Sequence, residues 1–235
     1  MIRHEFDDLI DNYRELHSKQ IALSGESGEF FAAYKAEKLA QWLPQLQGPV
    51  TMLDFGGGDG LMASRVHQRF SAARVIGVDA SPRSVEHAQR QYGGQAEFLW
   101  VKDRHLPFPD ATFDLVYASG VFHHIPFGEH AGYLDEIFRA LKSNGAFVLF
   151  EVNPFNPLSV WIFKTGVIDK SATMIFPARA RKTLKPYGRI KTKYYFFFPG
   201  FTRFLRGLEP YLEWLPLGGL YACVVKPEAK SVVRN

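Results

Sequence analysis

Five short apolar runs alternate with helical patterns through the middle of the chain. The runs are Thr51–Phe55, Arg74–Asp79, Ala96–Val101, Asp114–Ser119 and Ala146–Val152. Most of them are almost continuously apolar, which is typical of parallel strands covered on both faces. Helical patterns lie between them, near Leu61–Phe70, Arg83–Tyr92 and Glu129–Leu141. This alternation predicts right-handed crossovers and an α/β fold with a doubly wound, mostly parallel sheet.

A glycine-rich run, Leu53–Gly60, separates the first predicted strand from the first helix. It reads Leu-Asp-Phe-Gly-Gly-Gly-Asp-Gly, and the next strand ends in a second acid, Asp79. Glycines directly after a strand let the backbone approach a bound nucleoside closely. Ligands of open α/β sheets bind beyond the carboxyl ends of the strands, where Asp103 and Ser119 are also predicted to lie. The pattern therefore predicts half of a nucleoside-cofactor site.

The spacing of the glycines distinguishes between nucleoside cofactors. A dinucleotide site is typically Gly-x-Gly-x-x-Gly, whose helix amides meet a pyrophosphate. Here the third glycine comes one residue early, and Asp59 places an anion in the loop. That charge would repel a pyrophosphate but not a sulfonium or ammonium group. We therefore expect a cofactor with positive character at its centre, and a dehydrogenase is disfavoured.

Several motifs resemble the class I S-adenosylmethionine-dependent methyltransferases, and among them the methyltransferase type 11-like family. The motifs are Leu53–Gly60, Gly77–Ser81, Asp103 with Leu106–Asp110, Phe113–Val116 and Ser119–Ile125. They occur in family order between about residue 50 and residue 152. Leu141–Ala146 resembles the family's entry to strand five, with Ser-Asn-Gly where Pro-Gly-Gly is usual. The resemblance implies a Rossmann-like fold and S-adenosyl-L-methionine as cofactor.

The resemblance also implies a role for each residue of the cofactor site. It assigns the methionine end of the cofactor to Asp54, Gly56 and Gly58, and both ribose hydroxyls to Asp79, with Ala80 beside it. It assigns the adenine amino group to Asp103, flanked by Arg104, and the surroundings of the sulfonium to Ser119 and Gly120. Taken alone, Asp79 or Asp103 is also explained as a helix cap or turn acid. Their joint spacing from the glycine loop favours the cofactor.

The catalytic candidates are His123, His124 and Glu151. Methyl transfer from a sulfonium is an in-line displacement, so orientation supplies most of the catalysis and a base is needed only for some nucleophiles. The histidines follow strand four, on the side where the methyl group should point, and Glu151 ends strand five. Structural capping of the loop is the alternative role for the histidines. We expect no metal, because the spacing of the histidine pair to Glu129 and His130 matches no ligand pattern.

Further candidates for substrate contact are Tyr34, Lys35, Asn153 and Asn156. The first two belong to a helical pattern over Glu29–Leu43 that relatives use as a lid, and docking of this helix on the sheet is the alternative. The asparagines precede prolines at the rim, where turn formation is the alternative.

Two later runs, Tyr194–Phe198 and Leu220–Val225, predict closing strands and a sheet of seven. No repeat or long linker divides the chain, so we expect one domain. It comprises a helical cap or lid over residues 1–48, a cofactor-binding core over 49–152, and a substrate-side elaboration over 153–235.

Charge is unevenly distributed. Residues 170–208 hold ten Lys or Arg and no acid, so the net charge of +4 divides into +10 for this segment and −6 for the rest. We expect a basic-aromatic face that meets an anionic partner, with a solvated surface as the alternative. The motif Asn-Pro-x-Asn-Pro-Leu resembles one found in a bacterial subgroup of methyltransferases. Members of that subgroup act near the assembly of cell-surface glycans or polyprenyl-linked lipids.

The expected acceptor is accordingly a small-molecule, sugar, glycan or lipid-linked substrate, with peripheral contact to an anionic membrane surface and no DNA. An RNA methyltransferase and a non-catalytic cofactor-binding protein remain alternatives. One cysteine excludes an internal disulfide, and no apolar stretch approaches the roughly 18 residues of a spanning helix. We expect a cytoplasmic protein.

Overall fold

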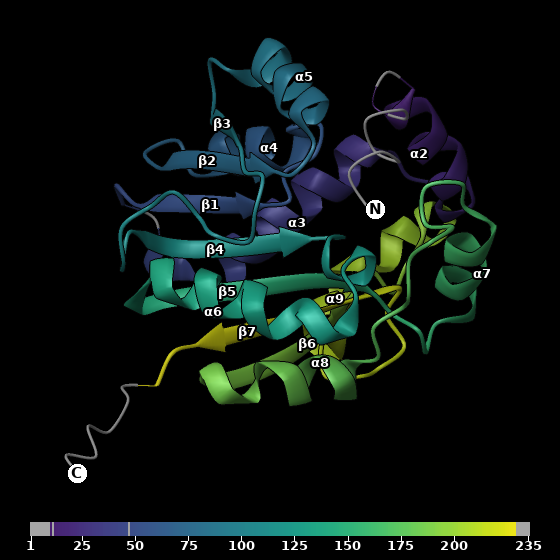
Figure 1. Ribbon diagram of the computed structural model, residues 1–235. Coiled ribbons are helices and arrows are strands. Elements are labelled where there is room, and N and C mark those ends of the chain that lie inside the picture. The colour runs from purple at the N-terminus through teal and green to yellow at the C-terminus, as the bar shows by residue number, and fades with distance from the viewer. Residues whose placement is uncertain (1–9, 11, 47, 229–235) are drawn as a thin grey trace.

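The computed structural model describes residues 10, 12–46 and 48–228, and its centre is one twisted sheet (Figure 1). Within these residues the sheet has seven strands in the order β3-β2-β1-β4-β5-β7-β6. The strands are β1 Thr51–Phe55, β2 Arg74–Asp79, β3 Glu97–Trp100, β4 Phe113–Ser119, β5 Leu141–Val152, β6 Arg189–Tyr195 and β7 Leu220–Lys226. The first five are parallel, and β7 runs antiparallel between β5 and β6. This confirms the predicted doubly wound sheet.

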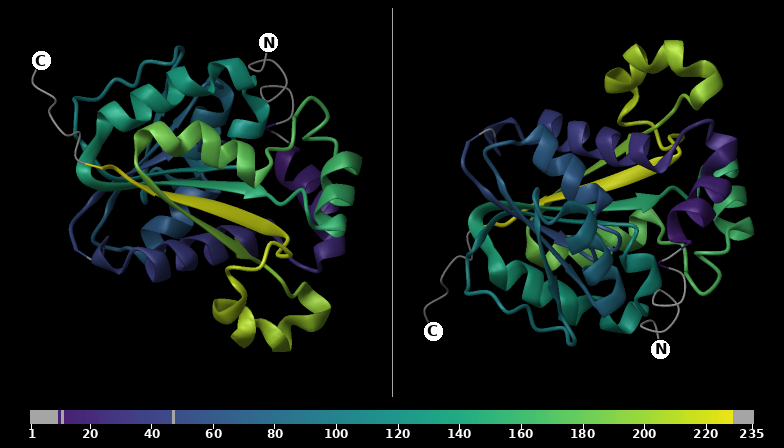
Figure 2. Two further views of the ribbon diagram at one scale, coloured as in Figure 1. Left: turned by 90° about the horizontal axis from the view of Figure 1, so that it is seen from below. Right: turned by 90° about the horizontal axis from the view of Figure 1, so that it is seen from above.

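Helices cover both faces of the sheet (Figure 2). The α-helices are α2 Tyr13–Ile21, α3 Gly28–Trp42, α4 Leu61–Arg69, α5 Pro82–Tyr92, α6 His130–Ala140, α7 Pro157–Thr165, α8 Pro177–Leu184 and α9 Glu209–Leu212. Short 3₁₀ helices are η1 Ala22–Ser24, η2 Pro44–Leu46, η3 Phe122–His124, η4 Phe127–Glu129, η5 Lys185–Tyr187 and η6 Gly200–Leu208. None of these described helices is both long enough and apolar enough to cross a membrane.

Two buried clusters hold the layers together. On one face Leu39 of α3, Val66 of α4 and Ala88 of α5 pack against the sheet. On the other face Ile137 of α6 and Leu184 of α8 do the same. Burying apolar surface on both sides of a parallel sheet is what its continuous apolar strands require.

Local signals set several element boundaries. The Oγ atom of Ser81 accepts a hydrogen bond from the backbone N–H of Ser84, and Pro82 follows at the first helical position of α5. Ser27 caps α3 in the same way through the N–H of Phe30. Such caps satisfy N–H groups that have no partner inside the helix. The two helices begin within a residue of their predicted starts for this reason.

The predicted strand Tyr194–Phe198 was wrong in its bounds. The strand is β6, which begins at Arg189 and ends at Tyr195. Phe196 has a φ angle of +59°, a left-handed conformation that turns the chain out of the sheet. Tyr195 and Phe196 are buried beside α3. The apolar character of this run therefore reflects burial of its side chains and does not indicate an extended strand.

The cations of the expected basic face lie on two sides of the sheet. The cations of α8 lie on the α6 side of the sheet, whereas η6 and α9 lie on the α3 side (Figure 2). Lys193 of β6 forms an ion pair with Glu213, beside α9, and Arg206 of η6 forms one with Glu26. The positive charge of residues 170–208 is thus divided between two faces and partly neutralised.

Candidate cofactor and acceptor site

The glycine loop turns sharply at the carboxyl end of β1. Gly56, Gly58 and Gly60 all have positive φ angles, of +75°, +52° and +81°. A Cβ atom on Gly56 would lie 2.5 Å from Cγ2 of Val121, and one on Gly60 would lie 2.8 Å from Cβ of Ala88. Glycine is therefore required for both conformation and close packing. No heavy atom of the described residues lies within 4 Å of a Cβ built on Gly58, so they leave this part of the loop open.

Asp79 at the end of β2 ties the glycine loop to the next turn. Its Oδ2 atom accepts from the backbone N–H of Gly58 at 2.9 Å, and its Oδ1 atom accepts from that of Ser81 at 2.8 Å. A carboxylate has about four lone-pair sites and can accept several hydrogen bonds at once. The geometry fits a carboxylate that receives two ribose hydroxyls.

Asp54 is the buried acid of this edge. Its side chain lies in β1, is 1% exposed, and its Oδ2 atom has no hydrogen-bond partner among the described residues. Burial, and then the nearby charge of Asp79, raise the pKa of Asp54 to about 8, although the neighbouring hydroxyl of Tyr117 acts in the opposite direction. An unsatisfied buried carboxylate oxygen is costly unless a cation or donor reaches it. The ammonium group of a methionine would satisfy this oxygen, so the residues fit the expected cofactor.

Asp59 in the glycine loop is paired with an arginine, which corrects the prediction that its charge selects the cofactor. Its carboxylate lies 2.9 Å from Nε of Arg14 and also accepts from the N–H of Leu61 at 3.1 Å. Arg14, from α2, donates in addition to the hydroxyl of Tyr92 at 2.6 Å. The anion in the loop is therefore neutralised by an arginine and does not set the charge that a cofactor meets. It serves instead to hold α2 over the glycine loop.

The predicted adenine and ribose neighbours lie in exposed loops. Asp103 and Arg104 follow β3 and are both exposed. The guanidinium of Arg104 lies over Gly132 of α6, where a Cβ would come within 2.6 Å of Nη1. The carbonyl of Ala80 accepts from Nε1 of Trp100 at 3.0 Å. The role of these residues toward adenine stays a prediction.

Lys35 reaches the edge from α3. Its Nζ atom donates to Oγ of Ser119 at 2.6 Å, directly before Gly120. Burial lowers the pKa of Lys35 to about 8, although Glu151 and Asp54 act in the opposite direction. A partly titrating ammonium group therefore lies beside the residues predicted to surround the sulfonium.

His123 is held between two carboxylates. Its Nδ1 atom lies 2.6 Å from Oε2 of Glu151, and its Nε2 atom lies 3.4 Å from Oδ1 of Asp169. Burial disfavours the charged ring, but the two carboxylates outweigh burial and raise the pKa of His123 to about 10. A Cβ on Gly120 would lie 3.6 Å from Cε1 of His123, so the ring adjoins the predicted sulfonium pocket.

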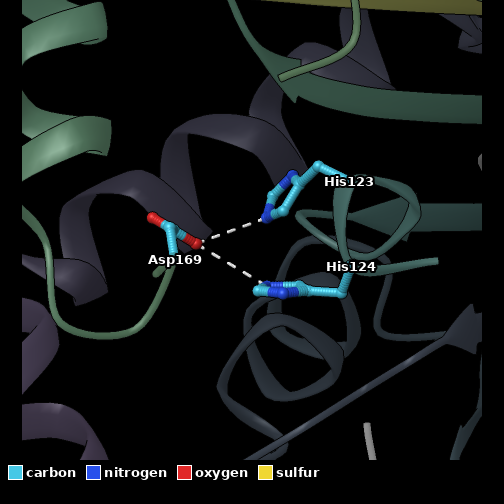
Figure 3. Close-up of side chains that lie close together, drawn as sticks. All are labelled: His123, His124 and Asp169. Atoms are coloured by element: carbon cyan, nitrogen blue, oxygen red, sulfur yellow. Dashed lines mark ion pairs between the residues drawn. The ribbon is translucent and has the colours of Figure 1, made fainter. Parts of the chain in front are cut away.

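His124 faces the same aspartate, and Figure 3 shows both rings directed at Asp169. The Nε2 atom of His124 lies 3.6 Å from Oδ1 of Asp169. Burial, and then the charge of His123, lower the pKa of His124 to about 4. The ring is therefore neutral at physiological pH and can accept a proton there.

Asp169 was missed from the sequence. It lies in the loop after α7, and its Oδ2 atom accepts from Nε2 of Gln20 in α2 at 2.6 Å. Gly166 allows this approach, because a Cβ there would lie 2.0 Å from the Gln20 amide. No local motif marks Asp169, since the chain path alone brings it to the histidines.

Comparisons with known proteins agree with the fold. Residues 53–149 match the family model described as a methyltransferase domain. These residues therefore form a methyltransferase domain of the class I S-adenosylmethionine-dependent type. S-adenosylmethionine is accordingly its cofactor, as the resemblance implied.

Individual relatives cover different parts of this methyltransferase. A sterol 24-C-methyltransferase of Eremothecium gossypii is 36% identical over 105 residues, which are 43% of this chain and 27% of that protein. The ubiquinone/menaquinone biosynthesis C-methyltransferase of Desulfotalea psychrophila is 31% identical over 126 residues, 51% of this chain and 50% of that protein. The methyltransferase thus spans between about a quarter and a half of these curated relatives.

A solved structure shares the fold. The crystal structure of a SAM-dependent methyltransferase from Archaeoglobus fulgidus matches with a TM-score of 0.63 and 19% identity, and covers 83% of this chain and 94% of that chain.

The metal site considered from the sequence, the histidine pair with Glu129 and His130, does not form in the structure. Glu129 is exposed, and Nε2 of His130 contacts the carbonyls of Phe122 and Ile125 at 3.0 and 2.9 Å. His130 therefore braces the loop.

The ligand atoms of His123, His124 and Asp169 do lie within 4.8 Å of one another. The imidazolium of His123 pairs with Asp169 within this group and with Glu151 beside it, so an ion network explains why these side chains lie together.

The remaining substrate candidates of the methyltransferase have structural partners. The amide of Asn153 donates to the carbonyl of Gly218 at 2.7 Å, and Asn156 caps α7 through the N–H of Ser159. The ring of Tyr34 on α3 lies 5.9 Å from the ring of Tyr195 in β6, so it helps to dock this helix on the sheet. These contacts are the alternatives weighed for each residue, and their contact with a substrate stays a prediction.

Proposed function

We propose that this methyltransferase transfers the methyl group of S-adenosylmethionine, by in-line displacement, to a small-molecule, sugar or lipid-linked acceptor in the cytoplasm. The observation that carries the proposal is the unpartnered buried oxygen of Asp54 beside the open glycine loop. Asp54 would receive the ammonium group of the cofactor, and Asp79 would receive the ribose hydroxyls. Asp103 would bind the adenine amino group, while Ser119 and Gly120 would face the sulfonium.

The acceptor would meet the cofactor beside the histidines. His123 adjoins Gly120, and His124 is neutral because its pKa is lowered. We propose His124 as the base that takes a proton from the acceptor, with Asp169 to stabilise the imidazolium that forms. His123 and Glu151 would position Asp169. The sulfonium is already an activated leaving group, so alignment of nucleophile, methyl carbon and sulfur supplies the rest.

The apolar part of the acceptor has a candidate binding place. An open pocket of about 240 Å³ lies between α2 and α7. Leu16, Leu23, Trp161 and Val167 line it, together with Gln20, which holds Asp169. Two of the curated relatives are named for sterol and quinone substrates, which are apolar lipids. These points support a lipid or lipid-linked acceptor, with the protein in peripheral contact with an anionic membrane surface.

The cofactor assignment is tested by thermal unfolding. We expect S-adenosylhomocysteine to raise the melting temperature and nicotinamide dinucleotides to leave it unchanged. Asp79→Ala should abolish the shift, whereas the matched control Asp114→Ala should retain it. Asp114 accepts from the N–H of Thr51 at 2.9 Å, at the amino ends of β4 and β1 and so away from the predicted cofactor site. Stabilisation by the dinucleotide alone would replace the proposal with an oxidoreductase.

The acceptor class is tested by transfer of a radiolabelled methyl group into a fractionated cell extract. Label in the organic-soluble fraction would support a lipid-linked acceptor, and label in the small polar fraction would support a sugar or metabolite. Label in RNA would favour the RNA methyltransferase. Absence of label from every fraction, in a protein that binds the cofactor, would favour a non-catalytic binder.

A further inference from the structure

The segment of residues 200–217 protrudes from the body of the molecule and exposes large apolar side chains. It comprises η6, α9 and the turn that leads to β7, and Figure 2 shows it standing clear of the other helices. Four aromatic side chains of this segment are 74 to 80% exposed, and two leucines are 51% and 55% exposed. These side chains are Phe201, Phe204, Tyr211, Trp214, Leu208 and Leu217. Apolar exposure gathered on one element of this kind indicates a contact surface.

The attached side of protrusion 200–217 is firmly held. Gly200 approaches the backbone of Gly25, since a Cβ on Gly200 would lie 2.5 Å from its carbonyl oxygen. Arg206 pairs with Glu26 and lies over the ring of Phe30, 4.5 Å from its centroid. The exposed apolar side is therefore presented by an anchored element, and no described part of the chain covers it.

The charges around protrusion 200–217 favour an anionic partner. Its two acids are withdrawn from the surface: Glu209 is buried and accepts from the N–H of Phe197, and Glu213 accepts from Lys38 and Trp42. The cation Arg203 is exposed on the protrusion.

Lys191 of the adjacent edge strand adds a second exposed cation. Because side chains alternate along a strand, Lys191 lies on the same face of the sheet as Lys193, whose Nζ atom contacts Glu213. The surface of protrusion 200–217 is thus aromatic and basic, without an exposed carboxylate.

We propose that protrusion 200–217 inserts its apolar side chains into the interface of an anionic lipid bilayer. Tryptophan and tyrosine rings favour the level of the lipid headgroups, phenylalanine and leucine the acyl boundary, and flanking arginine and lysine the anionic headgroups.

The position of protrusion 200–217 links it to the cofactor site. β6 runs parallel to β5, since both are antiparallel to β7, so the protrusion leaves the sheet at the carboxyl edge where the cofactor binds. Its anchor, Glu26 and Phe30, lies directly before and within α3, the helix that carries Lys35. Insertion would bring this edge close to the membrane. The inference deepens the membrane contact proposed above, but lipid binding itself requires no methyl transfer.

Flotation with lipid vesicles tests the proposal. We expect the full chain to float with vesicles of phosphatidylcholine containing roughly 30% phosphatidylglycerol and to bind far less to phosphatidylcholine alone. The double substitution F204S/W214S should lower the partition coefficient by roughly tenfold or more, since two rings no longer enter the interface. Leu99→Ser is the matched control, because Leu99 is 39% exposed on β3 at the opposite edge of the sheet. It should bind as the unmodified chain does.

Three results would overturn the proposal. The first is failure of the unmodified chain to float with anionic vesicles, and the second is equal binding by F204S/W214S. The third is a dimer, measured by light scattering, that F204S/W214S converts to a monomer, which would assign the surface to a second copy of the chain. Melting temperatures of all variants check that they are folded. Stabilisation by S-adenosylhomocysteine is measured separately, so loss of lipid binding and loss of the cofactor site give different results.

Discussion

The Nδ1 atom of His123 lies 2.6 Å from the Oε2 atom of Glu151, and both side chains are buried. The histidine belongs to η3, directly after β4, and the glutamate belongs to the neighbouring strand β5. This hydrogen bond places a proton on Nδ1 and directs Nε2 toward Asp169. The second carboxylate is thereby held beside His124, the proposed base.

Substitution of Glu151 by Gln should lower the pKa of His123 from about 10, because the carboxylate that favours the charged ring is removed. Turnover should fall by about tenfold or more, within the range of contributions from acid-base positioning. The ring is followed by an NMR titration, and cofactor binding by the thermal shift, which should be retained.

Glu213→Gln is the control for this change. Glu213 is also a poorly exposed carboxylate, but it pairs with Lys38 and Lys193 on the α3 side. It should lower the melting temperature and leave the titration of His123 unchanged. An unaltered His123 titration in Glu151→Gln would refute the assignment.

Substitution of His124 by Asn should reduce kcat by about 10² to 10⁴ with cofactor affinity unchanged, if the ring removes a proton from the acceptor. Since its pKa is lowered to about 4, the base is deprotonated at neutral pH. The rate should therefore be level through neutral pH and fall only as the pH approaches 4. His87→Asn on α5 serves as the control. Equal activity of the two variants would show that the nucleophile needs no base.

The titration of Asp54 should make stability depend on pH in the absence of cofactor. Its pKa rises from 3.8 to about 8 on folding, so the folded state retains a proton that the unfolded chain releases. The free energy of unfolding should therefore fall as the pH rises from about 4 to about 8. Asp54→Asn removes this loss, so the variant should gain stability relative to the unmodified chain over that range.

Denaturant unfolding at several pH values measures this effect. Asp114→Asn, at the opposite edge of the sheet, should show no comparable gain. Asp54→Asn should also lose stabilisation by S-adenosylhomocysteine, because a neutral amide attracts the ammonium group less than a carboxylate does. A gain in stability with full retention of cofactor binding would contradict the role assigned to Asp54.

Substitution of Arg14 by Ala should loosen α2 from the glycine loop. The ion pair to Asp59 is partly exposed, so we expect about 0.5 to 1 kcal/mol, or roughly a two- to fivefold loss of cofactor affinity. Faster hydrogen exchange in α2 should accompany it. Lys19→Ala is the matched control on the same helix, because Lys19 pairs with the exposed Glu15. Equal effects of the two variants would exclude a specific latch at Asp59.

Local physics explains why much of the fold was predictable. The bounds of β1 and β2 agree with the prediction, because an apolar run followed by glycine or a cap defines a strand end without reference to distant residues. The positions of Asp54 and Asp79 at the carboxyl edge follow from the same order of elements. The family resemblance then identified the cofactor.

Other features depend on contacts between segments far apart in the chain. Asp59 was interpreted from its own charge, but Arg14 neutralises it from 45 residues away. Asp169 carries no motif and reaches the histidines through the path of the loop after α7. The apolar run near Tyr194 indicated burial, yet the exposed apolar side chains lie in the segment that follows it. Periodicity and glycine placement report backbone conformation and average burial, whereas charge pairing, pKa and surface exposure depend on which distant side chains the folded chain brings together.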